Sequence, residues 1–221
     1  MKSMLSVVIT LIVMTAALSQ TAQKLVYADF EQLDKDKHPI SAREGKIIFD
    51  AAAENNSNRP KLAPRLLGPQ GPLTQRIGFE FEIFAPNKWA EASMKIVGMK
   101  DKGRLDDEAH TLIVKSEDLS QYSTLSLDIG AAGASQIRIR LISEGNGVDA
   151  GGAFPEKYLD LTDQLKTYRI PVSEFKQPTG DWVKKKVTTE QVIKKLTGVQ
   201  ISVVQVPSKG FLVLDNLAFE K

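Results

Sequence analysis

The chain of 221 residues contains no cysteine. Disulfide bonds are therefore excluded, and stability must come from a hydrophobic core, with a bound metal ion as the other available source. A bacterial lipoprotein anchor is excluded too, because that anchor needs a cysteine next to the cleavage site. A periplasmic or secreted bacterial protein fits this composition better than a small disulfide-rich secreted module.

Catalytic side-chain patterns are also scarce. His38 and His110 are the only histidines, and neither belongs to a metal-binding His-Glu-x-x-His motif. No serine lies in a Gly-x-Ser-x-Gly elbow. Two carboxylates for glycoside hydrolysis stay open as an alternative, since any two acids brought to within ~5–9.5 Å would suffice, but nothing in the sequence selects a pair. We therefore expect a protein without catalytic activity.

Charge of one sign is not concentrated anywhere. The 29 basic and 27 acidic residues give a net charge of +2, and they are interspersed along the chain. This distribution gives no electrostatic basis for nucleic-acid binding.

The sequence also lacks helices that alternate with the expected strands, which excludes a βαβ architecture.

The N-terminal segment is typical of a secretory signal peptide. A basic start at Lys2 precedes an apolar run over 4–14 and the small residues of 16–19. The run is too short to span a bilayer comfortably, so a permanent membrane anchor is the weaker alternative. We expect a signal peptide over 1–22, with cleavage after Ser19 or Ala22, and export to the periplasm or the medium.

The remaining residues, 23–221, are enough for one large all-β domain or for two small ones, with a substantial core in either case, and we expect a single domain. Alternation of period two is clearest over 77–84, 124–129 and 136–141. We expect ten or eleven short strands, a hairpin turn over Gly130–Ser135, and one short helix over 188–196. The segments 54–73 and 101–108 are expected to lie outside strands, the first as a mobile insertion or a functional loop. This pattern predicts an all-β fold, either an antiparallel β-sandwich or a barrel.

The final run, Gly210–Phe219, predicts a buried strand because its side chains are nearly all apolar. Asp215 and Asn216 interrupt it, and a buried polar pair must be hydrogen-bonded or bound to a cation. The sequence leaves both readings open.

Four segments, in order, resemble galactose-binding-like jelly rolls. They are the Tyr27–Glu31 start, the strand 119–129, the strand 167–175 with its Ile-Pro pair, and the Leu214–Leu217 finish. This resemblance covers most of the mature chain and extends to carbohydrate-binding modules and to the complex I intermediate-associated protein family. It implies a jelly-roll β-sandwich with one short helix, without catalysis, and often with a structural calcium ion. Tyr168 departs from the pattern, which often has tryptophan there.

If the first and last strands are neighbours, as in those jelly rolls, Asp215 together with Asp29 or Glu31 would supply calcium ligands. The alternative is that Asp215 and Asn216 only cap a strand edge by hydrogen bonds.

A sugar site needs an aromatic platform beside polar side chains that bond hydroxyl groups. The candidates are Trp182, Trp89, Tyr158, Asp128, Arg138, Arg140, Glu80 and Glu82. The polar members would equally form a cross-strand charge ladder, and Trp89 would equally plug the core. Trp182 is the most informative aromatic, because its loop is polar and offers no obvious burial. We therefore expect an exported module that binds a glycan or polysaccharide. The alternative is a protein-interaction or assembly module that docks through an exposed sheet face or the 54–73 segment.

Overall fold

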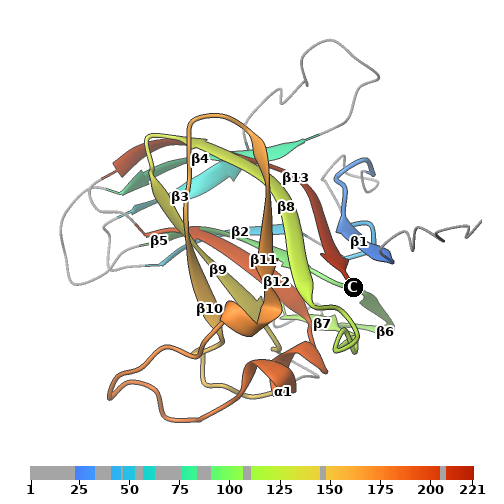
Figure 1. Ribbon diagram of the computed structural model, residues 1–221. Coiled ribbons are helices and arrows are strands. Elements are labelled where there is room, and N and C mark those ends of the chain that lie inside the picture. The colour runs from blue at the N-terminus through green and yellow to red at the C-terminus, as the bar shows by residue number, and fades with distance from the viewer. Residues whose placement is uncertain are drawn as a thin grey trace, which may run out of the picture.

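The last strand organises the molecule, as its sequence predicts. In the computed structural model, β13 (Ser208–Glu220) lies between β8 (Thr124–Ala132) and β4 (Ile77–Ile83), and its later half also pairs with β1 (Lys24–Ala28) (Figure 1). The side chains of Leu212, Leu214 and Phe219 are fully buried. The first and last strands are therefore neighbours, which confirms that part of the prediction.

The structure describes residues 23–32, 41–45, 47–52, 57–62, 76–83, 91–106, 111–144, 148–204 and 208–221. The predicted signal peptide 1–22, Trp89, and most of the segment 54–73 lie outside these ranges. Within them, no helix is long and apolar enough to span a membrane.

Two antiparallel sheets form a β-sandwich. The six-stranded sheet has the order β11-β8-β13-β4-β3, with β1 on the free part of β13; β11 spans Lys166–Pro171 and β3 spans Ser57–Leu62. The five-stranded sheet has the order β10-β9-β12-β5-β2. Its strands are β10 (Glu156–Asp160), β9 (Gln136–Ile142), β12 (Gly198–Val203), β5 (Glu91–Val97) and β2 (Ile47–Ala52). A separate pair joins β6 (Lys100–Asp106) to β7 (Thr111–Val114).

The core lies between the two sheets because each strand has one apolar face. Leu125, Leu127 and Ile129 of β8 and Ile137 and Ile139 of β9 are all fully buried. A 3₁₀ turn, η1 (Val172–Glu174), and one short helix, α1 (Thr189–Ile193), complete the described elements. The fold is thus the all-β antiparallel sandwich with a single short helix that the sequence predicts.

The expected hairpin over Gly130–Ser135 is wrong. β8 and β9 belong to different sheets, so this segment crosses from one layer to the other. The alternating pattern gives each strand one buried face, and that condition is met equally well by strands that face each other across the core. Gly133, at φ +85°, turns the chain at the crossing, where a Cβ would lie 2.1 Å from the carbonyl oxygen of Lys209.

Two segments expected to lie outside strands contain strands instead. Ser57–Leu62 forms β3 at the edge of the six-stranded sheet, and Lys100–Asp106 forms β6. Both segments are rich in polar residues and show no period-two apolar pattern, because an edge strand or a separate two-stranded pair has little core to face.

Candidate ligand-binding site on the five-stranded sheet

The face of the five-stranded sheet that points away from the core is polar. The register pairs Tyr158 of β10 with Arg138 of β9, Arg138 with Ser202 of β12, and Ser202 with Ser93 of β5. Because side chains alternate along a strand, these four residues form one row across the sheet while their apolar neighbours face the core. Tyr158, at one end of this row, is exposed, whereas Arg138, Ser202 and Ser93 are buried.

A second row lies two residues further along each strand. It places Glu156 opposite Arg140, Arg140 opposite Gln200, and Gln200 opposite Lys95. The two rows together bring charged, amide and hydroxyl groups onto one face of the sheet.

Two arginines and two glutamates form a connected network on this face. Arg138 makes an ion pair with Glu91, and its Nε lies 3.6 Å from Glu156 Oε2. Arg140 Nε donates to the same Glu156 Oε2 over 2.8 Å. The amide of Gln200 donates to Glu91 Oε1 at 3.2 Å and to Ser93 Oγ at 3.1 Å. The network fixes the side-chain positions before any ligand arrives.

Burial makes this network sensitive to charge. The side chains of Arg138 and Glu91 are 10% and 7% exposed. Burial, and next the neighbouring Arg140, lowers the pKa of Arg138, while Glu156 acts in the opposite direction. The guanidinium of Arg138 therefore depends on both glutamates for compensation of its charge.

A hollow of about 750 Å³ opens above this network. Its lining residues are Glu91, Arg138, Arg140, Gly152, Glu156, Tyr158, Pro178, Thr179 and Trp182. Tyr158 and Trp182 are 46% and 52% exposed, and Val26 is the only other large hydrophobic side chain exposed among the described residues. Two exposed aromatic rings beside a charged and hydrogen-bonding floor make this hollow the candidate site.

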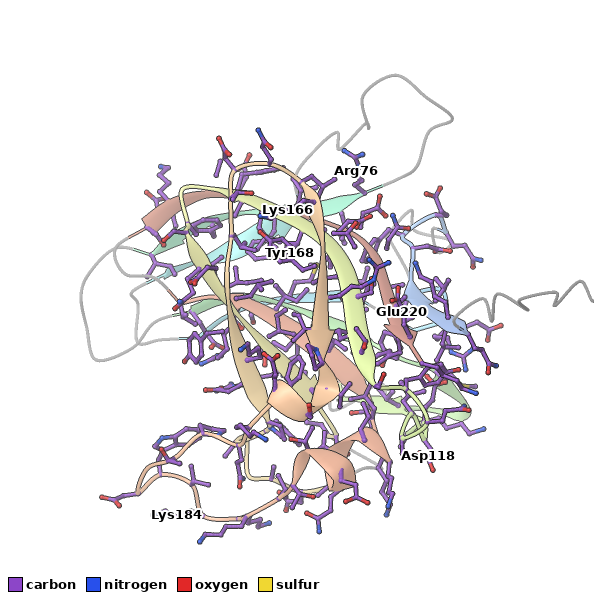
Figure 2. The ribbon with its side chains drawn as sticks, in the orientation of Figure 1. Arg76, Asp118, Lys166, Tyr168, Lys184 and Glu220 are labelled. Atoms are coloured by element: carbon purple, nitrogen blue, oxygen red, sulfur yellow. The ribbon has the colours of Figure 1, made fainter. Side chains whose placement is uncertain are left out.

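The aromatic ring of Trp182 is carried by the connection between η1 and α1. This connection projects from one end of the sandwich, where Lys184 is labelled in Figure 2. Gly180 has φ +147°, and a Cβ there would lie 2.9 Å from Cδ1 and Nε1 of Trp182. Glycine at this position therefore lets the indole ring fold back over the backbone.

The structure separates the predicted sugar-binding residues into two groups. Trp182, Tyr158, Arg138 and Arg140 meet in the hollow. The other described candidates, which are Glu80, Glu82 and Asp128, lie on strands of the six-stranded sheet, and Trp89 lies outside the described residues.

On the six-stranded sheet two of the three acidic candidates have local partners. Glu82 pairs with Lys209 at 3.0 Å. Asp128 accepts hydrogen bonds from Thr167 Oγ1 at 2.5 Å and from Asn216 Nδ2 at 2.8 Å. The alternative of a charge ladder between these acids and Arg138 or Arg140 is wrong, since the two arginines lie on the other sheet.

Asp215 is held by protein groups. Its Oδ1 accepts from the Asn216 backbone N–H at 2.8 Å, and its Oδ2 lies 3.6 Å from Arg76 Nε. Asp29 Oδ1 accepts from the backbone N–H of Glu31. No group of three or more acidic, histidine or cysteine side chains suited to a metal occurs among the described residues.

A guanidinium beside the Asp215 carboxylate repels a cation, so these residues do not fit a calcium site centred on Asp215. Burial raises the pKa of Asp215 to about 6, against the opposing hydrogen bond from Asn216. Calcium binding by the protein stays a prediction that this arrangement does not favour.

Several residues of the site are absent from the predicted set. They are Glu91 and Glu156, which line the hollow, and Gln200, Ser93 and Ser202, which lie beside them in the polar rows. Glu156 stands two residues before Tyr158 on β10, so alternation along that strand places both on one face. Glu91 is the first residue of β5 and has no comparable signal in the sequence.

The fold is similar to that of known carbohydrate-binding modules. A family 11 carbohydrate-binding module of a cellulosomal cellulase of Clostridium thermocellum aligns with a TM-score of 0.53 and 15% identity, over 89% of this chain and 94% of the module. A family 11 module from the same organism, in complex with a β-1,3-1,4-mixed-linked tetrasaccharide, aligns with a TM-score of 0.52 and 16% identity over the same shares. The chain thus has the β-sandwich fold of these modules.

Other comparisons add little. An exo-β-agarase aligns with a TM-score of 0.48 and 13% identity over 88% of this chain, which corresponds to 24% of that enzyme. No family model matches the chain, and no curated protein does. The resemblance to the complex I intermediate-associated protein family therefore has no support from the comparisons.

Proposed function

We propose that this chain is an exported, non-catalytic module that binds a neutral glycan in the hollow on the five-stranded sheet. The observation that carries the proposal is the position of two exposed aromatic rings, Tyr158 and Trp182, beside a floor of fixed arginine and glutamate side chains. Aromatic rings stack on the apolar face of a sugar, while the charged groups bond its hydroxyls.

The formal charges of the hollow favour a neutral ligand. Arg138 and Arg140 are matched by Glu91 and Glu156, and each arginine has a glutamate partner. An anionic ligand would compete with these carboxylates, whereas sugar hydroxyls can donate to the carboxylates and accept from the guanidinium groups together.

The same pairing argues against catalysis. Glu91 and Glu156 are each bonded to an arginine. This arrangement suits carboxylates that position hydrogen bonds, rather than one that transfers a proton and one that attacks. The predicted signal peptide over 1–22 supports export.

A protein-docking module would need a contiguous apolar surface. The three large hydrophobic side chains exposed among the described residues are Val26, Tyr158 and Trp182. Two of them line the hollow, and Val26 lies on the other sheet. The described surface therefore favours the glycan over a protein partner.

Titration of the mature chain with soluble neutral polysaccharides, followed by tryptophan fluorescence, tests the proposal. We expect a saturable change that Trp182→Ala abolishes and Tyr158→Ala weakens by about tenfold or more. Val26→Ala is the matched control, since it removes an exposed apolar side chain from the other sheet. A flat response over a broad panel, from protein shown to be folded, would refute glycan binding. Repeating the titration in EDTA tests the calcium prediction separately.

A further inference from the structure

One side chain outside the polar rows joins the segments that flank the hollow. Gln177 Nε2 donates to the carbonyl oxygen of Ala153 at 2.9 Å and to that of Lys185 at 2.6 Å. Its Oε1 accepts from the backbone N–H of Val187 at 3.1 Å. The side-chain amide of Gln177 thus forms three hydrogen bonds, all of them with backbone groups, and these groups belong to two separate segments.

These two segments carry opposite parts of the hollow. Gly152, next to Ala153, lines it from the connection between β9 and β10. The connection between η1 and α1 lines the hollow with Pro178, Thr179 and Trp182. Further along this connection, the backbone carbonyl of Lys185 and the backbone N–H of Val187 form hydrogen bonds with the Gln177 side chain. Gln177 therefore stands at the base of the Trp182 segment and ties it to the facing segment.

The base of this segment is also anchored to the sheet. Backbone hydrogen bonds link Lys176 and Glu156 in both directions, at 2.8 and 3.0 Å. Glu156 is the carboxylate that binds Arg140 on the floor. A second brace, an ion pair between Lys185 and Asp149, joins the same two segments but lies in solvent, with side chains 54% and 70% exposed.

We propose that Gln177 is a positioning residue that holds the Trp182 segment (residues 178–186) and the 149–153 segment at the separation the ligand requires. This inference rests on the proposed glycan site. Trp182 is exposed, so packing alone does not fix its ring. Without the amide, binding must order both segments at the moment of contact, and affinity falls by the free energy of that ordering.

The bonds of Gln177 to Ala153 and Val187 are partly buried, whereas its bond to Lys185 is exposed. The two partly buried bonds contribute more than the exposed ion pair of Lys185 and Asp149, because water and salt screen the ion pair. The test is Gln177→Met, which keeps the side-chain length and removes all three hydrogen bonds. Gln164→Met is the matched control, since Gln164 is exposed in the connection between β10 and β11. Lys185→Met removes the ion pair alone.

Two measurements separate the roles. Hydrogen exchange followed by mass spectrometry reports on the order of 178–187, and glycan titration gives Kd. We expect Gln177→Met to speed exchange in this segment, and to raise Kd by about tenfold, which corresponds to the loss of one or two hydrogen bonds. The melting temperature should stay near that of the wild type. Gln164→Met should change neither quantity, and Lys185→Met should change Kd by less than Gln177→Met.

Two results would overturn the role proposed for Gln177. Faster exchange with an unchanged Kd would show that the segment is ordered by Gln177 but that this order does not serve binding, and would overturn the proposal. Unchanged exchange would overturn it as well. If the wild-type chain binds no glycan, the proposed function fails on its own, and exchange alone then decides whether Gln177 holds the two segments together.

Discussion

Glu156 Oε2 accepts a hydrogen bond from Arg140 Nε at 2.8 Å and faces Arg138 Nε at 3.6 Å. One carboxylate therefore compensates two guanidinium groups on neighbouring positions of β9. Since its side chain is only 10% exposed, water contributes little to that compensation. The balance of charge on the floor of the hollow therefore depends on Glu156.

Glu156→Gln should leave Arg138 and Arg140 with one carboxylate, Glu91. We expect the free energy of unfolding to fall by about 1–3 kcal/mol, because a buried charge loses its partner. We also expect the preference of the hollow to move from neutral glycans toward carboxylated or sulfated ones. Urea unfolding and titration with matched neutral and acidic polysaccharides measure both effects.

Glu80→Gln is the control for this change, since Glu80 is an exposed acid of the six-stranded sheet. It should leave stability and ligand preference nearly unchanged. An equal response of the two variants would show that total charge, rather than the floor of the hollow, governs the preference.

The sequence predicts the class of fold because period-two alternation survives wherever a strand has one face on the core. Ile137, Ile139 and Leu141 show that pattern, and the structure buries all three. Alternation does not say which sheet a strand joins. Alternation therefore predicts a hairpin over Gly130–Ser135, whereas β8 and β9 belong to different sheets.

For the same reason, alternation could not show that the predicted site residues belong to two different sheets. Glu80 and Glu82 have the same alternation as Arg138 and Arg140, and only the topology places the two sets on different sheets. Trp182 was predictable because a tryptophan in a polar loop has no core to enter. Gln177 was not, since its partners are backbone groups that carry no sequence signal.

Asp215 should make stability depend on pH. Burial raises its pKa from 3.8 to about 6. Between these values the native state binds more protons than the unfolded chain, so stability is fully present below pH 4 and falls as the pH rises through 6. We expect Asp215→Asn to gain stability relative to the wild type over this window, by up to about 3 kcal/mol.

Urea unfolding of both proteins from pH 4 to pH 8 measures the difference. Asp163→Asn controls for the loss of one negative charge, since Asp163 is exposed in the connection between β10 and β11. A difference between Asp215→Asn and the wild type that stays constant over this range would rule out Asp215 as the titrating group.

Gly210 allows β13 to approach β8 closely. A Cβ at this position would lie 1.9 Å from the carbonyl oxygen of Ala132. Gly210→Ala should therefore destabilise the protein by about 1–3 kcal/mol or more, because backbone must move. Gly151→Ala is the comparison: φ is +58° there, but no atom lies within 4 Å of the added Cβ, so we expect a cost of about 1 kcal/mol from backbone strain alone. Thermal unfolding of both variants gives the ranking, and a reversed order would contradict this account of the β8–β13 contact.

The hydrogen bonding of the polar row can be tested by making the same serine-to-alanine change at Ser202 and at Ser93. The two are register partners on β12 and β5 and are both buried. Ser93 Oγ accepts from Gln200 Nε2 at 3.1 Å, whereas Ser202 Oγ makes no hydrogen bond within the described part of the chain. Ser93→Ala should cost about 1 kcal/mol, because it leaves a buried amide donor with one fewer partner.

Ser202→Ala should be neutral or stabilising by a few tenths to about 1 kcal/mol, since it removes a buried hydroxyl that lacks a partner. Chemical unfolding of the two variants, which share the same change on adjacent strands, isolates the hydrogen bond from the loss of volume. If Ser202→Ala proves as destabilising as Ser93→Ala, its hydroxyl has a partner in solution, and the row from Tyr158 through Arg138 to Ser202 is bonded more completely than the described contacts indicate.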